Sequence, residues 1–282
     1  ENCCFNGEEL WVMILEKAWA KVNAGYLNII GGQPTDPLST FTGFSKRLIY
    51  AYQKEVEEIW EIVSDADTSD NIICCSTKEK FDDEEMKNGL VANHAYTLIS
   101  AKTAKVDGKL IRLLKIRNPW GYKEWNGDWS ESSSQWNENT IKIFEREEEK
   151  DDGIFYMCIE DFHKYFGYIY ICYTIYDCNI KMYNMKNENI QIDKAQVFSL
   201  DIKSDSTDCT FTINTPYYRF NRHLKLKNSY HPISLILAKV NHNGSLEFLD
   251  GDFSADNDPS IKILLNKGKY LIWVYLGLNN KQ

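Results

Sequence analysis

The stretch that decides the fold is HAYTLISAKTAKVDGKLIRLLKIRN, which runs from His94 to Asn118. Its segments His94 to Ser100 and Leu110 to Ile116 predict two β-strands, and Asp107-Gly108 between them is a strong hairpin turn signal. Antiparallel pairing brings the start of the first strand beside the end of the second. We therefore expect the side chains of His94 and Asn118 to lie in contact.

A histidine held by an amide oxygen is the base half of a Cys-His-Asn protease site. The imidazole titrates near neutrality and can pair with a thiol, while the amide fixes its tautomer without adding a charge. Pro119 restricts Asn118 to an extended backbone, which helps fix where its amide points. By itself the pair is weak evidence, because a strand-end histidine is usually structural and Asn-Pro is a common turn former.

Two helices are expected before the hairpin. Asn6-Gly7-Glu8-Glu9 resembles a helix start, apolar residues recur at helical spacing from Leu10 to Val22, and Gly25 is placed to end the helix. Apolar residues from Leu48 to Val63 predict a second amphipathic helix that ends in the polar run Ser64 to Asp70. A strand is expected to begin at Asn71-Ile72-Ile73.

The pattern changes after the hairpin. The Trp-, Gly- and Ser-rich tract Trp120 to Asn139 predicts an ordered loop, and the aromatic stretch Ile154 to Tyr173 follows a charged run. From about Tyr176 only short strands are expected, at Gln196–Ile202, Thr210–Ile213, Ile233–Val240 and Lys269–Leu276. We therefore predict an α+β fold in residues 1–175 and an all-β sandwich in residues 176–282.

Composition excludes some classes of protein. A net charge of −9 over 282 residues, with a pI near 5.2, argues against nucleic acid as a partner. No stretch is long and apolar enough for a membrane span, the start does not resemble a signal peptide, and the absence of an initial methionine suggests a piece of a longer protein. The eight cysteines form no CxxC pair, so we expect no zinc and free thiols in a reducing, cytoplasmic compartment.

Four segments in order resemble the calpain family of cysteine proteases. GLVANHAYTL (Gly89 to Leu98) and LIRLLKIRNPWGYKEWNGDWS (Leu110 to Ser130) are similar to the family's histidine strand and asparagine turn. ELWVMILEKAWAKVNAGY and GIFYMCIEDFHKYFGYIYIC are similar to its opening helix and closing segment. The resemblance implies a papain-like protease subdomain, with N-terminal helices and an antiparallel sheet, followed by a C2-like sandwich such as the third domain of calpains.

The resemblance also implies roles for single residues. His94 falls on the catalytic histidine, Asn118 on the catalytic asparagine, and Trp120 on the tryptophan beside the cleft, so the expected substrates are proteins. The family's Gly-Asp-Cys-Trp nucleophile and upstream glutamine are missing: Cys3 and Cys4 lie too near the start. Cys74-Cys75 falls where the family has a buried cysteine. We therefore expect no proteolysis by this chain alone, and an N-terminal protease subdomain as its partner.

Calcium is a further implication. The family's Ca²⁺ ligands fall on Glu124, Glu131, the Lys150 carbonyl and Asp152, but one family acid falls on Ile154, which cannot ligate. Ca²⁺ takes six to eight oxygens, so these residues are equally well explained as solvated loop acids. In the sandwich, Asp250-Gly251-Asp252 with Asp256 and Asp258 suggests an acidic loop, for which an ordinary turn is the simpler explanation.

Rival interpretations remain open at this point. The parent protein could be a non-catalytic module in which the sandwich responds to calcium or contacts membrane lipid. A transglutaminase-type site also uses Cys and His, but it usually has Asp where Asn118 stands. The other histidines, among them His163, are expected to be structural. The tryptophans between Trp120 and Trp136 are expected to pack the long loop, with only Trp120 and Trp125 as candidates for a cleft wall.

Overall fold

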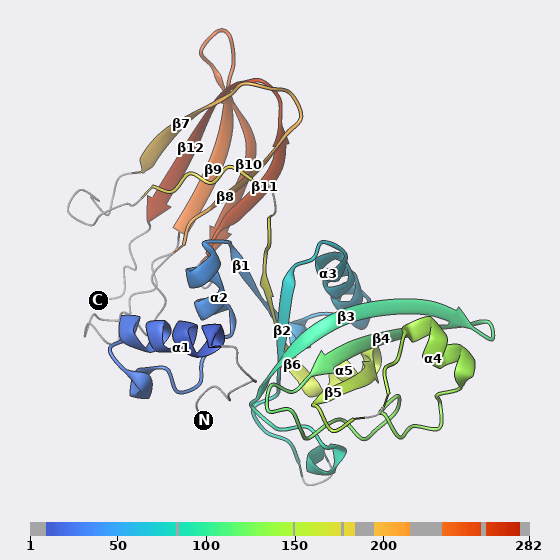
Figure 1. Cartoon of the computed structure of the whole chain (residues 1–282). Coiled ribbons are helices and arrows are strands. Elements are labelled where there is room, and N and C mark those ends of the chain that lie inside the picture. The colour runs from blue at the N-terminus through green and yellow to red at the C-terminus, as the bar shows by residue number, and fades with distance from the viewer. Residues whose placement is uncertain are drawn as a thin grey trace. The chain divides into compact units, whose positions relative to one another are not determined.

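The computed structural model describes residues 10–82, 85–148, 150–175, 178–183, 195–214, 233–254 and 258–276 (Figure 1). The chain divides into two units, Gln33–Tyr176 and a second unit formed by Glu1–Gly32 with Asp177–Gln282. The sequence pattern places residues 1–32 with the protease subdomain, whereas contacts group them with the C-terminal residues. Among the described residues no helix is both long and apolar enough to cross a membrane.

The first unit is built on one antiparallel sheet of six strands. In sheet order these are β1 (Lys46–Tyr50), β6 (Phe166–Cys172), β2 (Ile72–Thr77), β3 (Ala95–Val106), β4 (Lys109–Arg117) and β5 (Ile154–Cys158). The helices of this unit are α2 (Thr35–Thr42), α3 (Val56–Thr68), α4 (Glu138–Phe144) and α5 (Ile159–Tyr165), with short 3-10 turns at Ala51–Gln53 and Glu85–Asn88. The predicted α+β class is confirmed.

Strand β4 buries both of its faces. Leu114 and Ile116 point into the main core, where α3 and α5 contribute apolar side chains such as Ile59 and Phe162. Leu113 points to the other side, where it packs with Phe144 of α4 and with the long loop. Burial of each such side chain stabilises the fold by about 1.5–3 kcal/mol. The two sides together hold the hairpin rigidly, and with it the ends of β3 and β4.

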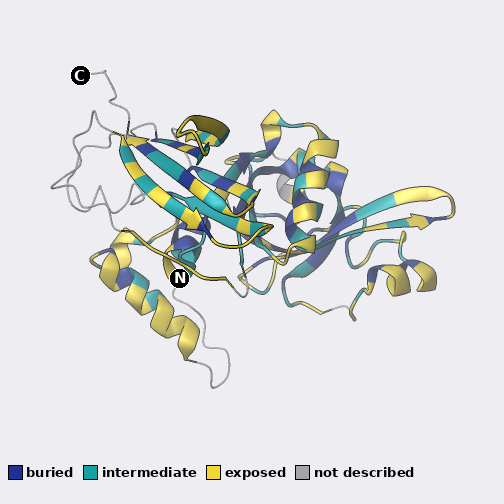
Figure 2. Ribbon diagram, turned by 90° about the horizontal axis from the view of Figure 1, so that it is seen from above, coloured by how far each residue is buried: buried dark blue, intermediate teal, exposed yellow. Residues whose placement is uncertain are grey.

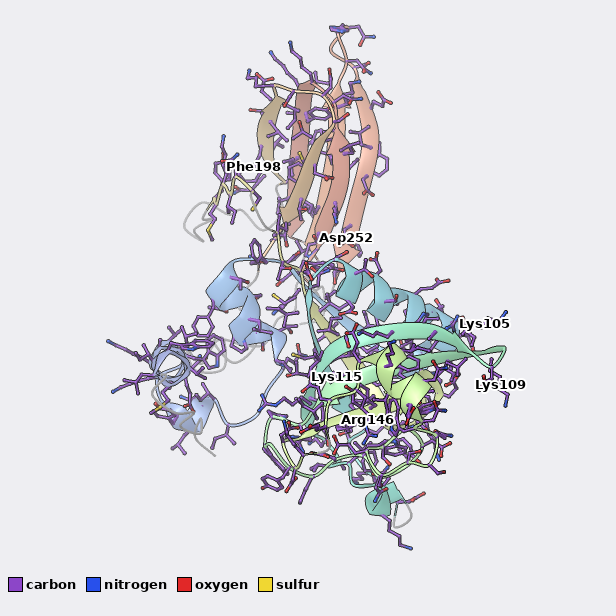
Figure 3. All side chains as sticks on the ribbon, turned by 45° about the vertical axis from the view of Figure 1, so that its right-hand side comes forward. Lys105, Lys109, Lys115, Arg146, Phe198 and Asp252 are labelled. Carbon is purple, nitrogen blue, oxygen red and sulfur yellow. The ribbon has the colours of Figure 1, made fainter. Side chains whose placement is uncertain are left out.

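The hairpin itself follows the sequence signal. Asp107 and Gly108 have positive φ angles of 49° and 81°, the conformation of a two-residue type I′ turn, and Val106 pairs with Lys109 across it. Lys105 and Lys109 mark this tip (Figure 3). The opposite end of the hairpin carries His94 and Asn118, each just outside its strand.

The second predicted helix is corrected by the structure. Leu48 lies in strand β1, where it pairs with Tyr170 of β6, and α3 begins only at Val56. A capping box between Glu55 and Glu58 sets that start. The helical spacing counted across Leu48 and Val56 therefore joins two different elements.

The first predicted helix exists as α1 (Trp11–Val22), and the expected cap at residues 6–9 lies outside the described residues. Most of its apolar stripe is exposed, including Trp11 and Ile14, and Ala20 is the one buried residue within its bounds (Figure 2). A short 3-10 turn, η1 (Tyr26–Asn28), follows it.

The described C-terminal strands form two sheets. One has the order β10 (Leu246–Ser254), β9 (Ile233–Val240), β12 (Gly268–Leu276), β7 (Gln196–Ile202), and the other pairs β11 (Ser260–Leu265) with β8 (Thr207–Thr212). Along β9 and β11 buried residues are interspersed with more exposed ones (Figure 2), and side chains from both sheets share one core. This is the packing of a sandwich, and the predicted sandwich is confirmed.

The predicted acidic loop of the sandwich is wrong for its central residues. Asp250, Gly251 and Asp252 lie inside β10, next to a bulge that follows Phe248. The Asp252 carboxylate, labelled in Figure 3, accepts a hydrogen bond of 2.8 Å from the Ser260 amide and so links β10 to β11. Asp256 lies outside the described residues, and Asp258 is buried.

Candidate active site

Asn118 lies at the end of the hairpin and is 0% exposed. Its Nδ2 donates to the carbonyls of Tyr122 (2.7 Å) and Lys123 (3.0 Å). Its Oδ1 accepts from the backbone N–H of Trp120 at 3.1 Å. Since carbonyl oxygens only accept, these partners fix which end of the amide is nitrogen and which is oxygen.

The orientation of Asn118 decides the tautomer of His94. His94 Nε2 lies 2.9 Å from Asn118 Oδ1. Because Oδ1 can only accept, Nε2 must carry the proton and donate it. In the neutral ring the lone pair then sits on Nδ1, so Nδ1 is the basic nitrogen.

The backbone around Asn118 is fixed as well. Its N–H donates to the Gly153 carbonyl (2.8 Å), and its own carbonyl accepts from Gly121 N–H (3.0 Å). Gly153 has a φ of +84°, and a Cβ on it would lie 2.6 Å from the Asn118 carbonyl oxygen. The chain before β5 therefore comes this close only because residue 153 is glycine.

Trp120 covers the histidine. The two ring centroids are 4.3 Å apart, and Trp120 is 36% exposed. Tyr122 stacks on Trp120 at 5.9 Å, and Lys123 Nζ lies 5.5 Å from the same ring. The Tyr96 ring meets His94 edge-on at 4.9 Å. Aromatic rings thus limit how the imidazole can turn.

Three of the described cysteines, Cys74, Cys75 and Cys158, are unsuited to act as the nucleophile. Burial raises the pKa of Cys74 to about 11 and that of Cys75 well above its ordinary value. Burial also raises the pKa of Cys158 to about 12, and this thiol donates to the Asp161 carboxylate at 3.2 Å. An activated cysteine has a lowered pKa, so these three environments oppose activation. Cys3 and Cys4 lie outside the described residues.

Two of the three side chains expected to bind calcium lie near each other. Glu124 accepts from Gly153 N–H at 2.7 Å, and burial, with the charges of Asp151 and Asp152, raises the pKa of its carboxyl group. Asp152 accepts from Ile154 N–H at 2.9 Å. Among the described residues, however, no three His, Cys, Asp or Glu side chains are grouped as a metal would require. Glu131 is therefore not brought together with the other two.

The remaining predicted residues have structural surroundings. His163 Nε2 lies 2.9 Å from the Lys54 carbonyl. Trp125 is buried, packs on Tyr165 and donates to the Asp128 carbonyl, so it belongs to the core and is not a cleft wall. Trp129 and Trp136 pack edge-to-face, as expected for tryptophans that anchor the loop.

The sequence did not reveal the Tyr122 and Lys123 carbonyls that hold Asn118. Backbone acceptors leave no residue-type signal, so only the folded loop could identify them.

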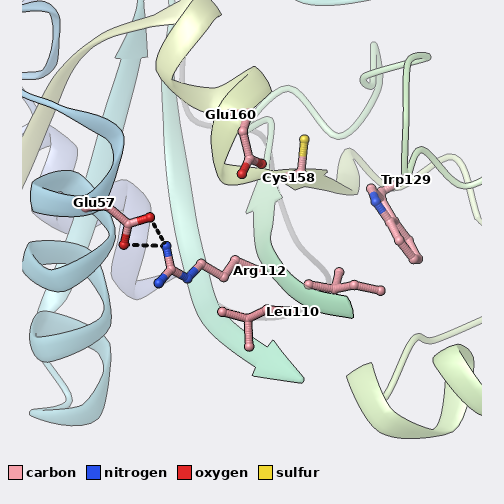
Figure 4. A pocket seen from close by; sticks show the side chains of 7 residues that line it. Glu57, Leu110, Arg112, Trp129, Cys158 and Glu160 are labelled. Atoms are coloured by element: carbon pink, nitrogen blue, oxygen red, sulfur yellow. Dashed lines mark hydrogen bonds and ion pairs between the residues drawn. The ribbon is translucent and has the colours of Figure 1, made fainter. Parts of the chain in front are cut away.

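A cleft of about 340 Å³ elsewhere in this unit does not include the candidate site (Figure 4). Its wall contains the ion pair between Arg112 and Glu57, together with Trp129, Cys158 and Glu160. Because neither His94 nor Asn118 lines it, we assign it no part in the chemistry described above.

Comparison with known proteins agrees with the geometry. The chain is 36% identical over 172 residues to the calpain-1 catalytic subunit of Macaca fascicularis, covering 59% of this chain and 24% of that protein. It is 34% identical over 190 residues to the calpain-1 catalytic subunit of Mus musculus (65% and 26%) and 34% identical over 169 residues to calpain-9 of Rattus norvegicus (58% and 24%). The matched part thus spans about a quarter of each relative. The model of the calpain family cysteine proteases matches residues 3–173, and the chain therefore belongs to the calpain family.

Proposed function

We propose that this chain supplies the general base and its orienting amide to a calpain-type endopeptidase that hydrolyses peptide bonds in proteins. The single observation that carries the proposal is the contact of 2.9 Å between His94 Nε2 and Asn118 Oδ1. The hydrogen bonds to Asn118 make this contact directional, and the direction leaves Nδ1 as the base.

In the proposed reaction a thiol from another part of the parent protein gives its proton to His94 Nδ1. The thiolate attacks the peptide carbonyl and forms a C–S bond, and the imidazolium returns the proton to the amine as the C–N bond breaks. Water then hydrolyses the thioester, with Nδ1 again accepting a proton. Asn118 holds the imidazole in position throughout, and this chain alone is expected to hydrolyse nothing.

The test is expression of the complete reading frame, followed by a protein-cleavage assay and labelling with a thiol-directed peptide inhibitor. We expect cleavage, and labelling at a cysteine outside the 282 residues of this chain, not at Cys3 or Cys4. His94→Ala should reduce cleavage by about 10²–10⁴-fold, the usual contribution of a general base. His163→Ala is the matched control, since its imidazole bonds to a backbone carbonyl instead. Full activity of His94→Ala, or a complete protein with no reactive cysteine, would refute the proposal.

Calcium binding is a second proposal, resting on the crowding of carboxylates around Glu124. A divalent cation would offset the repulsion of Glu124 by Asp151 and Asp152. The carboxylates present fall short of six oxygen ligands, so Ca²⁺ would keep several waters and bind with a Kd of roughly 10⁻⁴–10⁻³ M.

The free thiols of the described residues suit a reducing cytosol, which we propose as the compartment.

A further inference from the structure

The turn that precedes His94 needs hydrogen-bond partners for its backbone groups. Asn93 has a positive φ of 50°, so the chain reverses immediately before His94. His94 precedes the first residue of β3 and belongs to no strand. Its backbone groups and those of Val91 therefore need partners from outside the turn.

Thr77, at the end of β2, meets both ends of this turn. Its hydroxyl donates to the Val91 carbonyl at 2.7 Å and accepts from the His94 N–H at 3.1 Å. Its own N–H donates to the His94 carbonyl at 3.1 Å. Thr77 is 1% exposed, so solvent does not readily replace these bonds.

The same turn also receives a second hydroxyl, that of Tyr96. Tyr96 Oη accepts from the Val91 N–H at 2.9 Å, while the Tyr96 ring packs edge-on against the imidazole. Tyr96 also is 1% exposed. Two buried hydroxyl groups thus close the turn, but of the two only Thr77 bonds to the His94 backbone itself.

Asn118, which accepts the hydrogen bond of the imidazole, is itself fixed in position. Asn118 is held by five backbone groups, so the position of Oδ1 is set independently of His94. The alignment of Nε2–H with Oδ1 then depends on where the His94 backbone lies. A displacement of a few tenths of an ångström, combined with a change of angle, weakens such a bond steeply.

We propose that Thr77 is a positioning residue for the base, because its hydroxyl holds the His94 backbone where Nε2–H meets Asn118. The inference rests on the proposed function in naming His94 as the base. The positioning itself is a property of this chain and needs no nucleophile to be observed.

The test uses this chain labelled with ¹⁵N and follows the His94 Nε2–H proton by NMR. In the wild-type chain we expect a visible signal that exchanges slowly with water. Thr77→Val keeps the branched shape but loses the hydroxyl, and it should speed exchange roughly tenfold or abolish the signal, as expected when about one net hydrogen bond is lost. Thr77→Ser should restore it.

Ser76→Ala is the matched control. Ser76 is the neighbouring residue on β2, and its hydroxyl lies 3.3 Å from that of Tyr170, away from the turn. It should leave the His94 signal unchanged even where it lowers stability. If Thr77→Val does not fold, Thr77→Ala makes the same comparison, since the smaller side chain avoids an apolar methyl against the two backbone groups.

An unchanged Nε2–H signal in the folded Thr77 variant would overturn the inference, as would an equal change in Ser76→Ala. Failure of the proposed function would look different: the complete protein would cleave nothing while the signal and its dependence on Thr77 remained.

Discussion

The two candidate sites of the protease-like unit lie on the same loop region and differ in how complete they are. At Asn118 every side-chain polar atom has a directional partner within the chain, and the imidazole of His94 completes the set. At Glu124 one carboxylate oxygen accepts a hydrogen bond from a backbone N–H. Burial raises the pKa of this carboxyl group most, and the negative charges of Asp151 and Asp152 raise it further. The first site can be understood from its own residues, whereas the second needs a further ligand to become a site.

The largest effect is expected at the complete site. Asn118→Ala leaves the carbonyls of Tyr122 and Lys123 and the N–H of Trp120 without their partner, so it should lower the unfolding free energy by about 3 kcal/mol or more. Urea unfolding measures this, and the protected Nε2–H signal of His94 should disappear with it. The control is Asn126→Ala, because Asn126 is exposed and donates to the Lys87 carbonyl. Similar losses in both variants would contradict the special place of Asn118.

A second prediction asks whether the base has a thiol within the described residues. The pKa of Cys74 is raised from 9.0 to about 11, so at pH 8 its thiolate fraction should be about a hundredfold lower than that of an ordinary thiol. Alkylation followed by peptide mapping should show slow labelling of Cys74 that accelerates towards pH 11. Between pH 9.0 and about 11 the thiol of Cys74 has lost its proton in the unfolded chain but keeps it in the folded chain. The unfolding free energy should therefore fall as the pH rises through this range.

Substitution of His94 by alanine should not change the labelling rate of Cys74, Cys75 or Cys158. A dependence on His94 at any of these cysteines would mean that the base already has its thiol partner, contrary to the proposal that the thiol comes from another part of the parent protein.

A third prediction tests whether close backbone packing at Gly89 holds the loop that carries Glu124 without a metal ion. A Cβ on Gly89 would lie 1.9 Å from the Glu124 carbonyl oxygen, and Gly89 has a φ of +86°. Gly108 has nearly the same φ, +81°, with nothing within 4 Å of its Cβ position. Both alanine variants carry backbone strain of about 1 kcal/mol, and the clash should cost Gly89→Ala about 2 kcal/mol more. Equal unfolding free energies would show that the Glu124 loop is not held by this contact.

The smallest effect concerns calcium. At about ten times its Kd, Ca²⁺ should raise the unfolding free energy by about 1.4 kcal/mol, and Mg²⁺ should do less because it requires a stricter geometry. Glu124→Gln should abolish this gain, and Glu160→Gln in the separate cleft should preserve it. No stabilisation of the wild-type chain by Ca²⁺ would leave Glu124 and Asp152 as loop acids and end the second proposal.

Residues within one local element were predictable. The Asp107-Gly108 turn signal between two strand-like segments located the hairpin, and hairpin pairing places His94 near Asn118 whatever the rest of the fold. Leu48 was misassigned because its strand is defined by Tyr170, far along the chain. Asp250 and Asp252 have the composition of a turn, but β9 pairs with that segment and draws it into a strand.

The contacts that hold His94 and Asn118 in place were harder to predict from the sequence. Thr77 ends a strand that lies well before His94 in the sequence. Nothing in the sequence distinguishes a threonine that positions a histidine from an ordinary threonine at the end of a strand. The carbonyls of Tyr122 and Lys123 leave no trace in residue type. These contacts depend on tertiary structure and could be found only there.

The protonation pattern of the His94 ring in the neutral wild-type chain, read from its ¹⁵N chemical shifts and couplings, tests the proposed base most directly. We expect a proton on Nε2, protected by Asn118, and an unprotonated Nδ1 available as the base. A proton on Nδ1, or an unprotected ring that exchanges between the two forms, would contradict it.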